Sequence, residues 1–239
     1  MFRKIIVGAA AIALVGLLLS SSRSEDWAAS VKFPASEKPV RLFNGKDFEG
    51  WEGNTGENGT PKYFTIKEGA IVARNEADNA PPVSNYLLTK KHYRNFRLVF
   101  EGKLAESPMH SGIALWGKKY EKDGQVNSYQ GHLVMFPAGW GFYDLYRRMG
   151  KDMHKDDGRA KKADNGDWNK MEILATGHRI RLAVNGQLVA DWEDPQPELC
   201  GAGPIGLQLH SNKVAQEVRF RGLILSENPE ERLITVTEK

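Results

Sequence analysis

An Asn-Gly pair between two alternating segments constrains the fold of this chain more than any other feature. Ile180, Leu182 and Val184 alternate with more polar neighbours, Asn185-Gly186 follows, and a second segment runs over residues 187–192. Both residues of an Asn-Gly pair tolerate the positive φ of a type I′ turn. The pattern therefore predicts a β-hairpin.

The same two-residue period recurs along the chain. Phe96, Leu98 and Phe100 fall on one face of a predicted strand, and Val218 and Phe220 fall on one face of another. Further strands are predicted at residues 70–73, 113–116, 132–136, 142–146, 170–175 and 205–209. Long segments with apolar residues at helical spacing do not occur in the sequence. Strands that follow strands, with turn residues between them, indicate one antiparallel sandwich or barrel.

The composition is that of a folded protein without strong charge. The chain has 239 residues, of which 41% are hydrophobic and 26% charged, and this excludes a disordered or fibrous chain. Its 33 basic and 30 acidic side chains leave a net charge of +3, so nucleic acid is not an expected partner. The single Cys200 cannot form an internal disulfide, and the sequence has no cysteine pair for a zinc or redox motif.

The N-terminus has the pattern of an export signal. Two basic residues precede an apolar run over residues 5–19, and serines follow it. The run is shorter than the roughly 20 residues of a membrane span, so we predict a signal peptide over residues 1–24. The alternative is an uncleaved signal anchor. The cleaved protein is expected to be secreted or periplasmic, without stable membrane insertion.

The rest of the chain divides by pattern into three parts. Residues 25–39 are unpatterned, contain two prolines and are expected to form a linker. The sandwich is predicted over residues 40–226, with a peripheral tail over 227–239. Within the sandwich, residues 149–167 form a long polar segment that we expect to be a surface loop.

A series of short motifs runs through the predicted sandwich. They are Arg41-Leu42-Phe43-Asn44-Gly45-Lys46 ahead of Trp51, the segment 87–96 (LLTKKHYRNF), Ser111-Gly112-Ile113, the segment 168–173 (WNKMEI), the segment 203–210 (GPIGLQLH) and the segment 218–221 (VRFR). In this order they resemble the 3-keto-disaccharide hydrolase family. The resemblance covers residues 40–225. It implies a concanavalin A-like jelly-roll β-sandwich of two antiparallel sheets, in an exported bacterial protein that acts on carbohydrate.

The chain departs from the family pattern at the site that the resemblance implies. His110 stands where the family carries Asn, and Trp116 stands where it carries Arg. The family has a strand with a Glu, whereas the segment 128–136 (SYQGHLVMF) contains no acidic residue. Gln130 or His132 occupies the acidic position, depending on the alignment. The chain therefore either uses another residue or has lost the activity.

The reaction implied by the resemblance is cleavage of a 3-keto-glycoside. The ketone at C3 acidifies the C2 proton, so the reaction needs a base, an acid for the departing C1 oxygen and a donor to the enolate oxygen. His132 and His210 are the candidate base and acid, because imidazole titrates near neutral pH. Asp144 is a candidate assisting group, and Arg147 is a candidate to hold the enolate.

Aromatic and polar side chains near these residues are the expected substrate contacts. Flat aromatic faces suit a sugar ring, although core packing is their commoner use. Asp144 and Tyr146 share a strand face, which we take as the site face. Gln208 and His210 share a face of another strand and are expected to point to the concave side. Substrate contacts are expected from His110, Trp116, Gln130, Trp140, Tyr146 and Gln208.

Other site signals are weak. Asp164-Asn165-Gly166-Asp167 could ligate calcium, but such clusters are more often simple turns, and we expect neither a metal nor a cofactor. The sequence lacks the paired carboxylates of jelly-roll glucanases, which argues against a retaining glucanase. Besides the enzyme, two alternatives stay open: a non-catalytic carbohydrate-binding module and a laminin-G-like module that binds protein.

Overall fold

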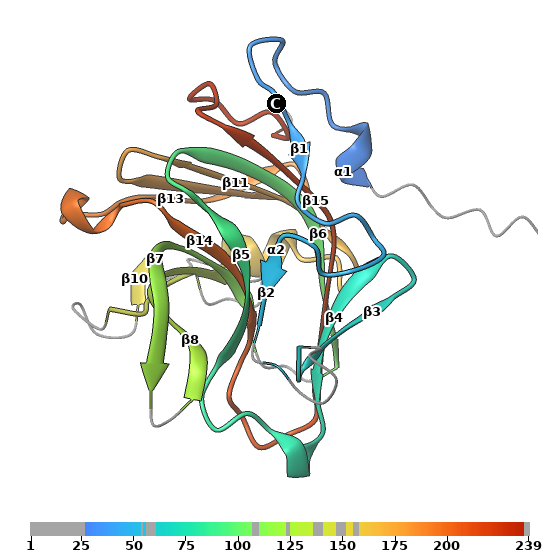
Figure 1. Ribbon diagram of the computed structural model, residues 1–239. Helices are drawn as coiled ribbons and strands as arrows, with labels where there is room; N and C mark the ends of the chain where they lie inside the picture. Colours follow the sequence, from blue (N-terminus) through green and yellow to red (C-terminus); the bar gives the residue numbers. More distant parts are fainter. Residues whose placement is uncertain are drawn as a thin grey trace, which may run out of the picture.

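The protein is a sandwich of two antiparallel sheets (Figure 1). The computed structural model describes residues 27–53, 55, 61–106, 110–122, 125–135, 141–146, 152–154 and 158–236. The predicted signal peptide therefore lies outside the described residues. The predicted all-β fold class is confirmed, since strands dominate and the helices are a single turn or little more.

The larger sheet, here called sheet A, has eight strands. Across the sheet they are β13 (Gln187–Glu193), β12 (Arg179–Val184), β11 (Asn169–Thr176), β6 (Phe96–Glu106), β15 (Gln216–Glu227), β4 (Ala70–Asn75) and β3 (Phe64–Lys67), with β1 (Val40–Arg41) also paired to β15. The predicted hairpin is confirmed: β12 and β13 pair across Asn185-Gly186, whose φ angles are 48° and 82°. Strands far apart in sequence, such as β6 and β15, lie side by side in this sheet.

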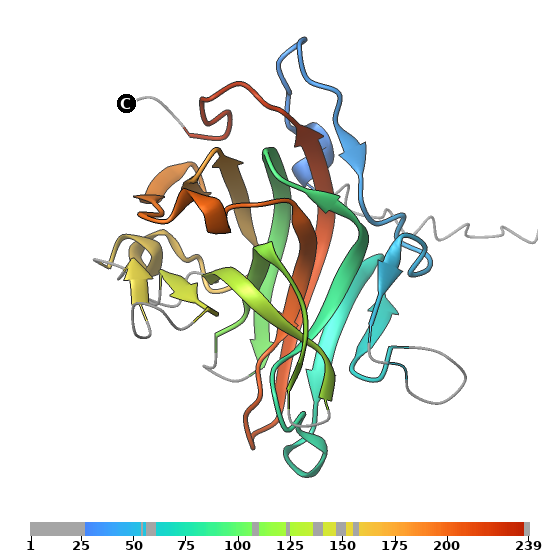
Figure 2. The same ribbon diagram turned by 60° about the vertical axis from the view of Figure 1, so that its left-hand side comes forward.

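The second sheet, sheet B, has seven strands and packs against sheet A (Figure 2). Across the sheet they are β10 (Asp152–His154), β9 (Phe142–Asp144), β8 (Gln125–Met135), β7 (Gly112–Lys122), β14 (Gly203–Leu209), β5 (Asn85–Tyr93) and β2 (Trp51–Glu52). The long strands β7 and β8 form a hairpin that extends from the body of the sandwich (Figure 1).

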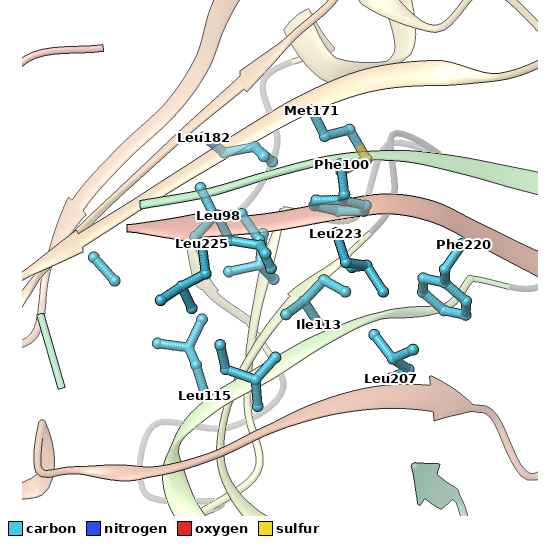
Figure 3. Close-up of a cluster of buried hydrophobic side chains, with 14 of the residues drawn as sticks. Leu98, Phe100, Ile113, Leu115, Met171, Leu182, Leu207, Phe220, Leu223 and Leu225 are labelled. Atoms are coloured by element: carbon cyan, nitrogen blue, oxygen red, sulfur yellow. The ribbon is translucent and has the colours of Figure 1, made fainter. Parts of the chain in front are cut away.

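The hydrophobic core fills the space between the two sheets (Figure 3). Leu98 and Phe100 of β6 point toward Ile113 and Leu115 of β7, and none of the four side chains is exposed to solvent. The alternation read from the sequence is the cause, because residues two apart on a strand share a face. A smaller apolar cluster, including Tyr86, Tyr129 and Leu133, lies on the other face of sheet B.

The outer face of sheet A is covered by the two terminal segments. Glu37 forms a bidentate ion pair with the fully buried Arg97, whose Nη2 and Nε donate to the two carboxylate oxygens at 2.9 and 3.1 Å. Arg97 also pairs with the buried Glu172, whose carboxylate accepts the backbone N–H of Ile234 and Thr235 at 3.0 and 2.9 Å. Residues 27–39, expected to be a linker, and residues 230–235 of the predicted tail are thus bonded to the sheet.

Short helical elements complete the described chain. They are α1 (Trp27–Ser30), α2 (Arg159–Ala163) and the 3-10 turns η2 (Ala77–Asn79) and η3 (Pro197–Leu199). The predicted polar loop over residues 149–167 contains β10 and α2. Of the helices in the described ranges, none has the length and apolar character to cross a membrane.

Candidate functional site

A cavity of about 480 Å³ opens on the outer face of sheet B. Its volume lies in the range of small-molecule sites. The described residues that line it are Pro82, Val83, Ser84, Tyr86, His110, Tyr120, Ser128, Tyr129, Gln130, Leu133, Tyr143, Leu145, Tyr146, Gln208, His210 and Ser211. Five of them are tyrosines, and none of these described residues carries a carboxylate, an ammonium or a guanidinium group.

Strand alternation places these side chains. Leu207 and Leu209 of β14 are fully buried in the core, so Gln208 and the following His210 face the opposite side. Tyr86 is the direct cross-strand partner of Gln208 in the neighbouring β5. His110 lies two residues before the start of β7, the other neighbour of β14. Three adjacent strands therefore bring these four residues to one wall of the cavity.

Two histidines meet in this wall. The rings of His110 and His210 are arranged edge to face, with centroids 4.5 Å apart. Burial, and then the charge of His210, lowers the pKa of His110 to about 4. Burial also lowers the pKa of His210. Both imidazoles are thus neutral at pH 7, and a neutral imidazole can accept a proton.

Two tyrosines of the wall are held by defined hydrogen bonds. The Gln208 Nε2 donates to the Tyr86 hydroxyl at 2.9 Å, and both side chains are buried. The Tyr129 hydroxyl donates to the Pro204 carbonyl oxygen at 2.7 Å. Burial raises the pKa of both phenols, so each keeps its proton at neutral pH.

Five of the residues singled out from the sequence line the cavity. They are His110, Gln130, Tyr146, Gln208 and His210. Tyr146 donates its hydroxyl to the Trp116 carbonyl oxygen at 3.1 Å, which fixes its ring at the cavity edge. Trp140 and Arg147 lie outside the described residues.

The expected site face is wrong within β9, although Tyr146, which lies beyond the end of this strand, does line the cavity. Asp144 is fully buried, as is its cross-strand partner His132, whereas Tyr143 and Leu145 line the cavity. His132 Nε2 lies 2.5 Å from Asp194 Oδ2. Asp144 is expected to face the ligand because it is polar. The interior between the sheets, however, holds a buried polar cluster of His132, Asp144 and Asp194 at this point. His132 and Asp144 therefore lie on the core side of sheet B, away from the cavity.

Trp116 also points into the core, not toward a ligand. It is 1% exposed, and its indole Nε1 donates to the Arg94 carbonyl oxygen at 2.6 Å. A β-bulge between Leu115 and Lys118 interrupts the pairing of β7 with β8, and Trp116 has a φ of 50°. A bulge turns the side chain that follows it. Alternation alone would have placed Trp116 opposite Leu115, on the cavity side.

Four of the five tyrosines that line the cavity, Tyr86, Tyr120, Tyr129 and Tyr143, are not among the site residues expected from the sequence. Residues 85–89 of β5 are all buried. This part of the strand therefore has no alternation that would indicate which face Tyr86 occupies. Tyr143 alternates with Asp144, so its position follows once the face of Asp144 is corrected. Tyr120, at the rim, is 43% exposed, which is unusual for a large aromatic residue.

Two groups of side chains have the residue types of metal ligands. His132, Asp194 and Cys200 are buried with ligating atoms within 4.8 Å of one another. The imidazole and carboxylate are 2.5 Å apart, closer than the roughly 3.3 Å between two ligands of one tetrahedral zinc. This contact is therefore a hydrogen bond. In the segment over residues 164–167, Asp164 Oδ1 accepts from Gly166 N and Asn169 Nδ2, as in a turn.

Comparison with protein families identifies the family of the chain. Residues 38–225 match the model of the 3-keto-α-glucoside-1,2-lyase-like domain. The chain belongs to this family. The match spans the sandwich from just before β1 to β15, and the resemblance read from the sequence motifs is confirmed. Searching curated protein sequences gave no match.

Solved structures share the sandwich. Two proteins from Parabacteroides distasonis ATCC 8503, both provisionally assigned as glycosyl hydrolases, superpose with TM-scores of 0.55 and 0.52 at 20% and 22% identity. The matches cover 79% of this chain and 93% and 98% of theirs. A β-1,3-1,4-glucanase (lichenase) from a mouse hindgut metagenome superposes with a TM-score of 0.50 at 13% identity, and the match covers 81% of this chain and 99% of the glucanase chain. These structures share the β-sandwich fold of the chain, and the family match shows that the domain is carbohydrate-active.

Proposed function

We propose that the protein cleaves 3-keto-glycosides by elimination followed by hydration. The observation that carries the proposal is the His110–His210 pair in a cavity whose described wall has no carboxylate. Two-carboxylate glycosidase chemistry needs two acidic side chains flanking the bond. An α-proton beside a ketone is instead within reach of a neutral imidazole base.

In the proposed reaction His210 takes the C2 proton of the oxidised sugar. The C–H electron pair forms the C2–C3 double bond, and negative charge collects on the C3 oxygen. As that charge returns to the carbonyl, a C1–C2 double bond forms and the C1–O bond breaks. The imidazolium of His210 gives its proton to the departing oxygen. Water then adds across C1–C2, with hydroxyl at C1 and hydrogen at C2.

The cavity wall supplies the sugar contacts in this proposal. Gln130 and Gln208 offer amide groups to sugar hydroxyls, and His110 offers a second imidazole. The rings of Tyr143 and Tyr146 offer flat faces to the C–H face of a pyranose. Arg147, which lies outside the described residues, stays a prediction as the group that holds the enolate.

The direct test is a turnover assay with oxidised and ordinary sugars. The purified protein is incubated with 3-keto-trehalose, 3-keto-sucrose and a 3-keto-aryl glucoside, and with their unoxidised forms, and products are followed by mass spectrometry. We expect 3-keto-glucose or its dehydrated form from the keto-sugars only. His210→Ala should abolish release. His178→Ala, which changes an exposed histidine paired with Glu193, should not. Absence of wild-type turnover on every keto-sugar overturns the proposal.

The alternative function is a carbohydrate-binding module without catalysis. The five tyrosines of the cavity favour it, because aromatic platforms bind sugars without any chemistry. It predicts calorimetric binding of a sugar with no product. It also predicts that Tyr143→Ala weakens binding more than His210→Ala does. An enzyme shows the reverse order in turnover, because losing its base lowers kcat more than it lowers affinity.

We also propose that residues 1–24 direct export. The support is the sequence pattern alone: basic residues, an apolar run too short to span a membrane, and small residues after it. Expression in a bacterial host, with the intact mass of the mature protein measured from each cell fraction, tests this. A secreted or periplasmic species that begins near Glu25 is expected. A full-length species in the membrane fraction would show an uncleaved anchor.

A further inference from the structure

Two buried side chains of the cavity wall have unused hydrogen-bonding capacity. The Tyr86 hydroxyl accepts from Gln208 Nε2 at 2.9 Å. Across the described part of the chain, its own proton has no acceptor. Gln208 Oε1, in a side chain that is 2% exposed, likewise has no donor there. A buried polar atom without a partner costs free energy, so each one indicates a ligand that completes it.

We propose that Tyr86 and Gln208 together recognise an α-hydroxyketone, with Tyr86 as the donor to the ketone oxygen. A ketone oxygen only accepts hydrogen bonds, and the hydroxyl on the adjacent carbon can donate. A phenol O–H beside an amide oxygen matches that pair of groups. In a 3-keto-glycoside the ketone at C3 is flanked by hydroxyls at C2 and C4. This inference rests on the proposed function and names a residue for it.

The same contact would serve the reaction. When the base removes the C2 proton, negative charge develops on the C3 oxygen and the Tyr86 hydrogen bond to it becomes charge-assisted and stronger. No proton has to move from Tyr86, because burial raises the pKa of its phenol and keeps it protonated. Gln208 holds the hydroxyl in place through Nε2, so the donor is oriented before the substrate arrives.

The position of Tyr86 agrees with this role. It is the direct cross-strand partner of Gln208. Gln208 lies two residues before His210, which directly follows the end of β14. The donor and the proposed base therefore come from adjacent strands and face one cavity. By contrast, the hydroxyls of Tyr129 and Tyr146 already donate to backbone carbonyl oxygens. Among these three tyrosines of the cavity, Tyr86 alone has its proton available.

Kinetics of Tyr86→Phe test the proposal. Removing one donor to a developing oxyanion typically costs about 100-fold to 1000-fold in kcat, and we expect a loss in this range with 3-keto-trehalose. Tyr93→Phe is the matched control, because Tyr93 is a buried tyrosine of the same strand outside the cavity. A Tyr86→Phe enzyme within threefold of the wild-type kcat overturns the role of Tyr86 while the proposed function stands. A wild-type protein without turnover overturns the function itself.

A spectroscopic measurement separates this role from a structural one. In the His210→Ala background, 3-keto-trehalose labelled with ¹³C at C3 binds without turnover, and its carbonyl stretch reports on hydrogen bonding. We expect the band to move to higher wavenumber when Tyr86→Phe is added. Gln208→Met, a second variant for the case that Tyr86→Phe does not fold, should move the band the same way in this background. In a protein with His210 intact, Gln208→Met should raise KM. An unchanged band in the folded variants overturns the proposal.

Discussion

The imidazole rings of His110 and His210 meet edge to face at 4.5 Å inside a cavity that is lined mostly by uncharged side chains. Neither ring can be charged at low cost, because burial lowers the pKa of both and the charge of His210 adds to the effect on His110. The arrangement couples the cavity to pH, and this leads to the first prediction.

Acid should destabilise the protein through His110. Its pKa is about 4 in the folded chain and about 6.5 when unfolded, so the unfolded state binds more protons between these values. Stability is therefore complete above about pH 6.5 and is lost as the pH falls toward 4, with about 3 kcal/mol at stake. Urea unfolding from pH 7.5 to 4.5 measures this. His110→Asn should reduce the dependence to the part that His210 contributes, and His178→Ala should leave it unchanged. Parallel curves for wild type and His110→Asn would contradict the prediction.

The hairpin, the fold class and one wall of the cavity follow from sequence alternation. The expected face of Gln208 and His210 agrees with the structure, in which both line the cavity. The apolar Leu207 and Leu209 alternate with them and are fully buried in the core. The family motifs supplied the topology that periodicity alone leaves open. What the sequence could specify was the face of a strand wherever one face is clearly apolar.

The errors have two physical causes. A buried polar cluster reversed the expected face of Asp144 and His132, because polar side chains were assumed to face outward. A bulge turned Trp116 into the core, and bulges leave no periodic trace in the sequence. Tyr86 could not be found at all, since its relation to Gln208 depends on which strands pair.

The buried position of His132 leads to the second prediction. His132→Ala removes a hydrogen bond to Asp194 and leaves a cavity among aromatic rings. The ring centroids of Trp116 and Trp192 lie 5.6 and 6.1 Å from that of His132. We expect a loss of about 2–4 kcal/mol in unfolding free energy, with kcat per folded molecule changed only a few-fold. His210→Ala should show the opposite pattern. A stable His132→Ala protein without turnover would return His132 to the catalytic site.

The third prediction concerns the ion pairs that hold the terminal segments. Arg97 and Glu172 have fully buried side chains, and Glu37 is nearly so. Removing one partner of a buried pair leaves charge in the interior, so Arg97→Met should cost about 3–5 kcal/mol. Arg74→Ala is the matched control, because Arg74 is itself exposed and pairs with Glu76 and Glu106 at the surface. Its third partner, the buried Glu217, keeps an ion pair with Arg219, so the change should cost about 1 kcal/mol or less. Equal losses in urea unfolding would show that burial is not what matters.

The last prediction concerns the glycines where β7, β8 and β14 approach one another. A Cβ on Gly203 would lie 2.1 Å from the Gly117 carbonyl oxygen, and one on Gly117 would lie 2.0 Å from that of Gln130. Backbone cannot yield as a flexible side chain does, so Gly203→Ala must push β14 away from β7. We expect the free energy of unfolding to fall by about 1–3 kcal/mol or more. Sugar binding should also weaken, because β14 carries Gln208 into the cavity wall.

Gly201→Ala is the control, because a Cβ at this position would have no heavy atom within 4 Å in the described structure. This change should alter the free energy of unfolding by about 0.5 kcal/mol or less. Thermal unfolding and calorimetric sugar binding on both variants measure the two effects. A Gly203→Ala protein as stable as Gly201→Ala would mean that the strands can separate freely at this point and that their close approach does not hold the cavity wall in place.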